Sequence, residues 1–191
     1  MNRVDEIKKF VIERFFTCLP DGLYYHNLEH TLDVFEVTVC IGKAEKLSDT
    51  DIELLRVAAL FHDTGFVETY ENNEHLGAEH AADCLPQYGY SLAEISKIKR
   101  AILATNLRIP PKNLFEKVLC DSDLDYLGRD DFEPRSHSLF EELKFWGKIE
   151  TKEQWDKLQI QFLAGPHYFT DYSLKNRAPQ VAKNFKKISG E

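Results

Sequence analysis

Hydrophobic residues recur at intervals of three and four along most of the chain, which is the spacing of the buried face of an amphipathic helix. In the first such stretch Val4, Ile7 and Phe15 share one face, and the turn-forming residues 20–22 (Pro-Asp-Gly) follow it. The same spacing predicts further helices over residues 28–46, 51–63, 74–88, 92–105, 114–128, 137–147, 151–164 and 178–188. No segment alternates polar and apolar residues over a useful strand length, so we expect an all-α fold.

Residues that cap or stop helices stand at several of the predicted boundaries. Asn27 and Ser91 can accept hydrogen bonds from the free amide groups of a first helical turn. Either Ser48 or Thr50 can do the same before the third predicted helix. Gly65 follows that helix, at a position where a glycine commonly ends a helix.

Composition indicates one soluble-type globular domain with an ample core. The chain has 191 residues, of which 43% are hydrophobic, including 13 Phe and 8 Tyr. This apolar content suffices for a packed core without a structural metal, so a bound metal would serve chemistry. The formal net charge of -8 argues against a long nucleic acid as partner, because such proteins usually present a basic face. A small phosphorylated substrate remains compatible with this charge.

Cysteine usage and the N-terminal segment indicate the cellular compartment. The four cysteines lie far apart and form no C-x-x-C pair, so we expect free thiols rather than disulfides or a zinc site. The N-terminal segment mixes charged and apolar residues and lacks the apolar run of a signal peptide. No stretch approaches the roughly 20 apolar residues of a membrane span. We therefore expect a cytoplasmic protein that does not bind a membrane.

Residues 59–66 (Ala-Leu-Phe-His-Asp-Thr-Gly-Phe) place His62 and Asp63 at the end of an apolar helix. Adjacent side chains in mid-helix point about 100° apart, whereas at a helix end they can turn toward a common point. Ionisable groups among apolar residues need partners, and a metal ion is one such partner. A hydrogen-bonded His-Asp pair in the core is the ordinary alternative, and the dipeptide alone does not separate the two.

Two further segments supply residues of the same kind. His26 and His30 are four positions apart and share a helix face, which suits one metal ligand and one solvent-reaching histidine. Within residues 118–132 aspartates alternate with other residues, and Asp123 has leucines on both sides. A site of two imidazoles and two carboxylates would then comprise His30, His62, Asp63 and one of Asp121 or Asp123.

Such a donor set indicates the kind of metal. Imidazole nitrogens with carboxylate oxygens suit a divalent Mn, Fe, Ni, Co, Zn or Mg ion better than they suit a thiolate-bound structural zinc. Four protein ligands leave octahedral positions open for a water molecule and a phosphate oxygen. An ion held in this way could activate the water and polarise the phosphoryl group.

The ordered set H…HD…D over about residues 24–130 resembles the HD superfamily of metal-dependent phosphohydrolases, which includes nucleotidases and cyclic-nucleotide phosphodiesterases. The resemblance implies one helical HD-domain/phosphodiesterase-like bundle over residues 1–191, with helices flanking that core at both ends. In the D-x-D pattern of this superfamily the second aspartate usually binds the metal. The implied metal ligands are therefore His30, His62, Asp63 and Asp123.

The same resemblance implies a reaction. His26 stands in an H-N-x-x-H arrangement similar to that of the proton-donating histidine of the cyclic-nucleotide phosphodiesterases. The expected activity is metal-dependent hydrolysis of a phosphate ester, as a phosphomonoesterase or phosphodiesterase. The expected substrate is a small nucleotide or a related phosphorylated metabolite.

Other polar residues are candidates for supporting roles. Glu74 or His75, at the start of the fourth predicted helix, could relay a proton to or from the attacking water, although His75 could equally cap that helix. His80 lies five positions after His75, so the two cannot face one site. Tyr126 is a candidate contact to a sugar or base. Arg129 is a candidate contact to a phosphate, with a salt bridge as its ordinary alternative.

Two other functions are compatible with the same scaffold. A di-iron oxygenase would need further ligands, of which His75 and His80 could supply only one at a single site. A non-catalytic ligand-binding module commonly lacks a metal ligand that this chain retains. Two irons per chain with oxygen consumption would favour the oxygenase. Failure to hydrolyse a broad panel of phosphate esters would favour the binding module.

Overall fold

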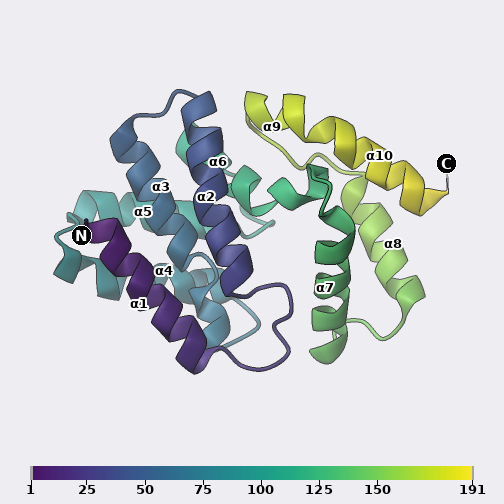
Figure 1. The fold of residues 1–191 in the computed structure, drawn as a ribbon, viewed down its shortest axis with the longest axis horizontal. Coiled ribbons are helices and arrows are strands. Elements are labelled where there is room, and N and C mark those ends of the chain that lie inside the picture. The colour runs from purple at the N-terminus through teal and green to yellow at the C-terminus, as the bar shows by residue number, and fades with distance from the viewer. Residues whose placement is uncertain (1, 191) are drawn as a thin grey trace.

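The computed structural model describes residues 2–190, which form α-helices joined by short 3₁₀ helices and loops (Figure 1). The α-helices are α1 (Arg3–Cys18), α2 (Leu28–Ala44), α3 (Asp49–Phe61), α4 (Asn73–Cys84), α5 (Leu92–Ala104), α6 (Leu114–Asp123), α7 (Phe132–Phe145), α8 (Lys152–Leu163), α9 (Asp171–Asn176) and α10 (Ala178–Ser189). The 3₁₀ helices are η1 (Thr64–Val67), η2 (Leu85–Tyr88) and η3 (Asp125–Gly128). No strand occurs among residues 2–190, which confirms the predicted all-α class.

Helix α3 lies at the centre of the N-terminal half and contacts α1, α2, α4, α5 and α6. Figure 1 shows α2 and α3 running side by side, with α5 behind them. The residues of α3 without exposed surface are Leu55, Val57, Ala58, Ala59, Leu60 and Phe61. This helix is therefore buried around most of its circumference, and the residues that follow it start from a position fixed by packing.

The C-terminal helices α7, α8 and α10 pack around a second, smaller group of buried apolar residues, and they occupy the right-hand side of Figure 1. Phe132 of α7, Leu163 of α8 and Val181 of α10 belong to this group. Tyr126 and Leu127 of η3 belong to it as well. Because η3 directly follows α6, this short turn joins the two halves of the molecule.

The predicted helix caps are largely confirmed. The Asn27 side chain accepts hydrogen bonds from the backbone N–H groups of Glu29 and His30. Ser48, rather than Thr50, caps α3. The Ser91 side chain forms a reciprocal capping box with the third residue of α5. All four cysteines are free thiols, as expected.

The third helix ends earlier than predicted. Helix α3 ends at Phe61 instead of Asp63, and the Thr64 hydroxyl donates to the Phe61 carbonyl oxygen (2.9 Å). The prediction that Gly65 stops the helix is wrong, because this residue lies inside η1. Position 65 requires glycine for another reason, because a Cβ there would lie 2.0 Å from the Asn73 carbonyl oxygen.

Other boundaries also differ from the hydrophobic pattern. The fourth predicted helix is divided into α4 and η2, and the sixth is broken at Leu124 into α6 and η3. The break places Asp125 against Arg177 (2.7 Å). Helix α7 begins at Phe132, ahead of the predicted start, with Pro134 in its first turn, where a missing amide hydrogen is tolerated. The short helix α9 is too brief to show a period and was not predicted.

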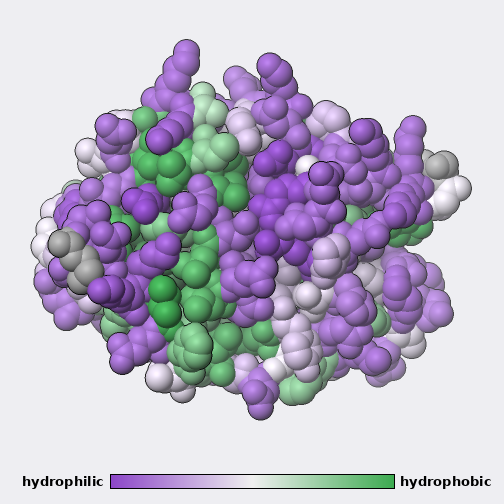
Figure 2. All heavy atoms as spheres, viewed as in Figure 1, coloured by the Kyte–Doolittle hydropathy of each residue, from purple (hydrophilic) through white to green (hydrophobic). Residues whose placement is uncertain are grey.

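The face of the molecule that Figure 2 presents is mainly polar. Figure 2 shows that hydrophilic residues cover most of the face that it presents, with hydrophobic side chains visible chiefly over the N-terminal helices. Among residues 2–190, no helix combines the length and the apolar character that a membrane-spanning segment requires.

Gly77 allows α4 to approach the end of α3 closely. A Cβ at this position would lie 2.5 Å from the Phe61 carbonyl oxygen and 2.8 Å from that of His62. Backbone atoms cannot move aside as a flexible side chain can, so any other residue would push α4 away from the segment that carries His62.

We expect Gly77→Ala to lower the free energy of unfolding by about 1–3 kcal/mol, because overpacking outweighs the helix-propensity gain of about 1 kcal/mol. Denaturant titration followed by circular dichroism measures this change. Gly165→Ala is the matched control, since a Cβ there makes an ordinary 3.5 Å contact with the Phe162 carbonyl oxygen. Equal stability of the two variants would contradict the close approach at Gly77.

Candidate metal centre

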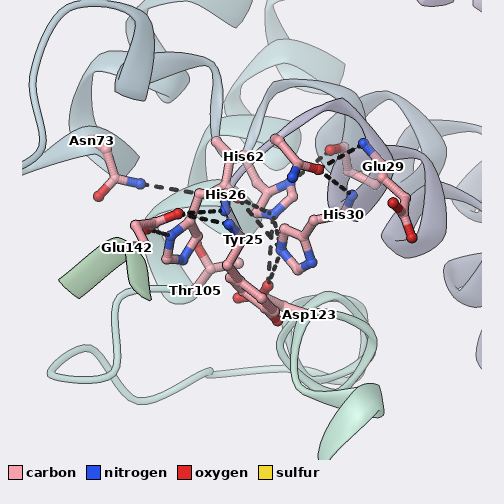
Figure 3. Close-up of polar contacts among 12 residues, drawn as sticks. Tyr25, His26, Glu29, His30, His62, Asn73, Thr105, Asp123 and Glu142 are labelled. Atoms are coloured by element: carbon pink, nitrogen blue, oxygen red, sulfur yellow. Dashed lines mark hydrogen bonds and ion pairs between the residues drawn. The ribbon is translucent and has the colours of Figure 1, made fainter. Parts of the chain in front are cut away.

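Four side chains from three helices converge on one buried point. Nε2 of His30 and Nε2 of His62 lie 3.3 Å apart. Oδ1 of Asp123, the last residue of α6, lies 3.0 Å and 3.6 Å from these two nitrogens. Oδ2 of Asp63 lies 3.4 Å and 3.1 Å from the same nitrogens. Figure 3 shows His30, His62 and Asp123 turned toward one another, and one donor atom from each lies within 4.8 Å of the others.

Local structure explains why these side chains meet. The Asn27 side chain caps α2 and accepts a hydrogen bond from the His30 amide, which fixes the first turn. His62 follows the last residue of α3, and its Nδ1 donates to the Ala59 carbonyl oxygen (2.7 Å), leaving Nε2 to face the cluster. Asp63 leaves the helical conformation (φ -104°, ψ 4°), so its carboxylate turns toward the same point.

The imidazoles and carboxylates of the cluster shift one another's pKa values. Burial alone would raise the pKa of the Asp123 carboxyl, but hydrogen bonds and charges from His30 and His62 hold it far below its usual range. Burial alone would lower the pKa of His62, yet the nearby charges of Asp63 and Asp123 raise it well above its usual range. The nearby imidazoles likewise lower the pKa of Asp63, so both carboxylates are ionised at neutral pH, and a cation that binds there displaces the proton of the His62 imidazole.

The donor set fits a divalent cation. Asp63 Oδ2 is buried and has no hydrogen-bond partner, although the two imidazoles are close by. When His62 is neutral, its Nδ1–H is used by the Ala59 carbonyl, so its Nε2 presents a lone pair. Buried lone pairs that face one another need a positive charge between them, and nitrogen with carboxylate oxygen suits Mn, Fe, Co, Ni, Zn or Mg.

The structure separates the two aspartates that the sequence left open. The Asp121 carboxylate is fully buried and accepts hydrogen bonds from the backbone N–H groups of Phe169 and Thr170 (2.9 Å each). It also accepts a hydrogen bond from the Thr170 hydroxyl. This side chain fastens the segment before α9 to α6, whereas Asp123, two positions on, points into the cluster.

His26 lies beside the cluster in a tightly defined position. Its Nδ1 donates to the Glu142 carboxylate, which is fully buried. The same carboxylate accepts hydrogen bonds from the backbone N–H groups of Tyr25 (2.8 Å) and His26 (2.9 Å) and from the Tyr70 hydroxyl (3.0 Å). The imidazole ring stacks on Phe66, with 4.4 Å between ring centroids. The hydrogen bond at Nδ1 and the stacking on Phe66 together fix the orientation of the His26 ring.

Burial by itself would lower the pKa of His26, but the hydrogen bond to Glu142 and the neighbouring carboxylate charges outweigh it and raise that pKa. Sequence reasoning missed Glu142. A signal was present, because Glu142 lies three positions after Leu139 and four before Trp146, on the apolar face of α7. A lone acidic residue on such a face indicates a buried partner elsewhere in the chain.

The candidates on α4 have different surroundings. Glu74 is half-buried and lines the cavity described below, whereas His75 is exposed and does not contribute to that wall. His80 bonds through its two ring nitrogens to the Thr64 hydroxyl (3.1 Å) and to Glu68 (2.8 Å). Neither of the two histidines reaches the cluster, so they supply no second metal ligand set there.

Of the two candidate substrate contacts, Tyr126 lines the cavity described below and Arg129 does not. Tyr126 is buried, lines the cavity and lies 5.2 Å from Tyr25 between ring centroids. Arg129 does not line the cavity, because its guanidinium is held by Asp33 (3.0 Å) and Asp131 (2.7 Å). For Arg129 the structure thus shows the salt bridges that were the alternative to a phosphate contact.

A cavity of about 390 Å³ opens from the cluster, and His26, Asp63 and Asp123 form part of its wall. Its volume lies within the range of sites for small molecules. The cavity extends from the ends of α3 and α6 to the facing sides of α7 and α8, which supply Leu139 and Leu158. A small molecule bound in it would therefore touch both the cluster and the C-terminal helices.

Comparison with known proteins agrees with this geometry. Among solved structures, the chain is similar to a predicted HD superfamily hydrolase from an uncultured Thermotogales bacterium, at 22% identity and a TM-score of 0.65. The similarity covers 99% of this chain and 91% of that one, and at this identity it shows a shared fold. No curated protein matches the chain. The model of the HD domain matches residues 27–129, which include all four converging side chains. Since this match covers more than half of the sequence, the chain belongs to the HD domain family.

Proposed function

We propose that the protein is a metal-dependent phosphohydrolase that cleaves a phosphate ester of a small metabolite. The observation that carries the proposal is the convergence of His30, His62, Asp63 and Asp123 beside a positioned histidine, at the end of a cavity. Bound by these four residues, a divalent ion supplies Lewis acidity toward a water molecule and a phosphoryl oxygen.

His26 is proposed as the proton donor to the leaving group. Glu142 accepts the Nδ1 proton, so the proton that protonated His26 can release is the one on Nε2. Stacking on Phe66 holds the ring plane. In the reaction the water oxygen bonds to phosphorus, the bond from phosphorus to the ester oxygen breaks, and this oxygen takes the His26 proton. The products are an alcohol and inorganic phosphate.

Asn73 and Glu74 are proposed to support the metal ligand Asp63 and the attacking water, respectively. The Asn73 side chain is buried and its amide nitrogen lies 3.5 Å from Asp63 Oδ1, which orients that carboxylate. Glu74 is half-buried in the wall of the cavity, where it can take the proton that the attacking water gives up. His75 is exposed, so we assign this relay to Glu74 alone.

A screen of generic esters tests the proposal. The protein is loaded in turn with Mn, Mg, Co and Ni and assayed with p-nitrophenyl phosphate and bis(p-nitrophenyl) phosphate. We expect hydrolysis of at least one ester with at least one metal, abolished by a chelator and restored by the metal. Absence of hydrolysis with every pair would favour a non-catalytic binding module, and oxygen consumption by an iron-loaded protein would favour an oxygenase.

Replacement of a metal ligand should remove the ion. We expect Asp63→Asn and Asp123→Asn each to weaken Mn²⁺ binding by more than about tenfold. Loss of a residue that only hydrogen-bonds to a metal ligand already costs about tenfold or more, and these variants remove a charged ligand itself. Calorimetric titration measures the affinity. Asp83→Asn is the matched control, since Asp83 is exposed on α4, and its affinity should equal that of the wild type. Unchanged affinity in both ligand variants would argue against the assignment.

Replacement of His26 and Glu142 should separate catalysis from positioning. We expect His26→Asn to lower kcat by about 10²–10⁴-fold with little effect on metal affinity. A proton donor must be protonated, so activity falls as pH rises through the pKa of His26. Because Glu142 raises that pKa, Glu142→Gln should move the alkaline limb of the kcat profile to lower pH.

The control for Glu142→Gln is the neighbouring Glu141→Gln. Glu141 is only partly buried and does not line the cavity, so this variant should keep the wild-type pH profile. Identical profiles for the two glutamine variants would show that Glu142 does not tune His26. Circular dichroism of both variants checks that the fold is intact.

A further inference from the structure

We infer that the esterified group of the substrate is uncharged and apolar, an aryl or alkyl group that carries a single phosphoryl group. The inference rests on the proposed phosphohydrolase function and specifies the substrate class of the same site. It follows from the two unlike ends of the cavity that opens from the metal centre.

One end of the cavity is polar and the rest is apolar. The polar end comprises His26, Asp63 and Asp123, with Asn73 and Glu74 beside them. Most of the remaining wall is aliphatic or aromatic, and the part that faces the cluster from α7 and α8 includes Leu139, Leu143, Leu158 and Phe162. A phosphoryl group at the polar end therefore places its ester substituent against hydrocarbon.

The charge of the wall limits the number of phosphoryl groups. Over the part of the chain that the structure describes, no lysine or arginine contributes to this wall, and Glu74 adds a further acidic group. Two arginines that follow α6 in the sequence, Arg129 and Arg135, both form ion pairs with Asp131 and so are not free to bind a phosphate. Each further phosphoryl group adds negative charge beside the carboxylates, and no lysine or arginine of this wall offsets it, so a di- or triphosphate is disfavoured relative to a monophosphate.

The polarity of the wall disfavours a nucleoside as the ester group. A base and a ribose carry many donors and acceptors. Outside its polar end, the wall offers the polar side-chain atoms of Thr105, Gln159, Trp155, Tyr25, Tyr70 and Tyr126, and the Tyr70 hydroxyl is already bonded to Glu142. Each polar group buried without a partner lowers affinity by roughly five- to a hundredfold. An alkyl or aryl group meets no such penalty and gains from burial of its own surface.

The part of the apolar wall that α7 and α8 supply lies outside the residues that the HD-domain model matches. Helices α7 and α8 follow the matched residues 27–129, and Figure 1 shows them as a separate group beside the N-terminal bundle. The metal ligands thus come from the matched region, and the α7 and α8 side chains of the wall come from helices that follow it.

The test compares ester groups on the metal-loaded protein. We expect kcat/KM to rise from ethyl to octyl phosphate by about fourfold for each methylene that finds room in the cavity. AMP and ADP should be at least about tenfold poorer than octyl phosphate. A higher kcat/KM for AMP or ADP than for octyl phosphate would overturn the inference and leave the phosphohydrolase function standing.

Binding provides a second readout that does not need turnover. Octylphosphonate should bind the metal-loaded protein at least about tenfold more tightly than methylphosphonate in calorimetric titration. If no ester is hydrolysed, the phosphohydrolase function fails, and this affinity ratio then decides the apolar site by itself. Equal affinities would overturn the inference.

A pair of matched variants locates the effect. Leu158 of α8 lines the cavity and is 44% exposed, so Leu158→Gln should leave the fold intact and reduce the octyl-to-methyl affinity ratio by about fivefold. Leu174 of α9 is 50% exposed and does not line the cavity, so Leu174→Gln should keep the wild-type ratio. Equal ratios in the two variants would contradict a binding role for the α8 wall.

Discussion

The structure depends on holding four buried ionisable side chains within a few ångströms of one another. Two imidazoles and two carboxylates meet at the ends of α2, α3 and α6, where little water screens them. Helix α3 is fixed on nearly all sides by apolar packing, and Gly77 lets α4 close against its end. The hydrophobic core thus supplies the rigidity that keeps these donors together, and a bound cation would compensate the charge of the two carboxylates in place of an imidazole proton.

Much of the site was predictable because its determinants are local. Asn27 fixes the first turn that carries His30, and the end of an apolar helix carries His62 and Asp63. The choice between Asp121 and Asp123 was not predictable by the same means. It depends on which carboxylate meets the amides of residues 169–170, and this contact joins segments nearly fifty positions apart.

The partners of the site from the C-terminal half were beyond the reach of periodicity. Glu142 lies 116 positions after His26, and its only sign in the sequence is an acidic residue on an otherwise apolar face. The same limit applies to Arg129, whose placement follows from the contact with Asp33 across the chain. Helix patterns show which face is buried, but not which distant side chain a buried charge will meet.

The buried carboxylates of Asp121 and Glu142 have a consequence for cooperativity. Asp121, two positions before Asp123, holds residues 169–170, and Glu142 of α7 holds the backbone at Tyr25 and His26. Each half of the molecule is therefore tied to the other through a bond that adjoins a candidate active-site residue. Local opening of the C-terminal helices would release these residues as well, so the candidate metal centre and the α7 and α8 wall of the cavity form one unfolding unit.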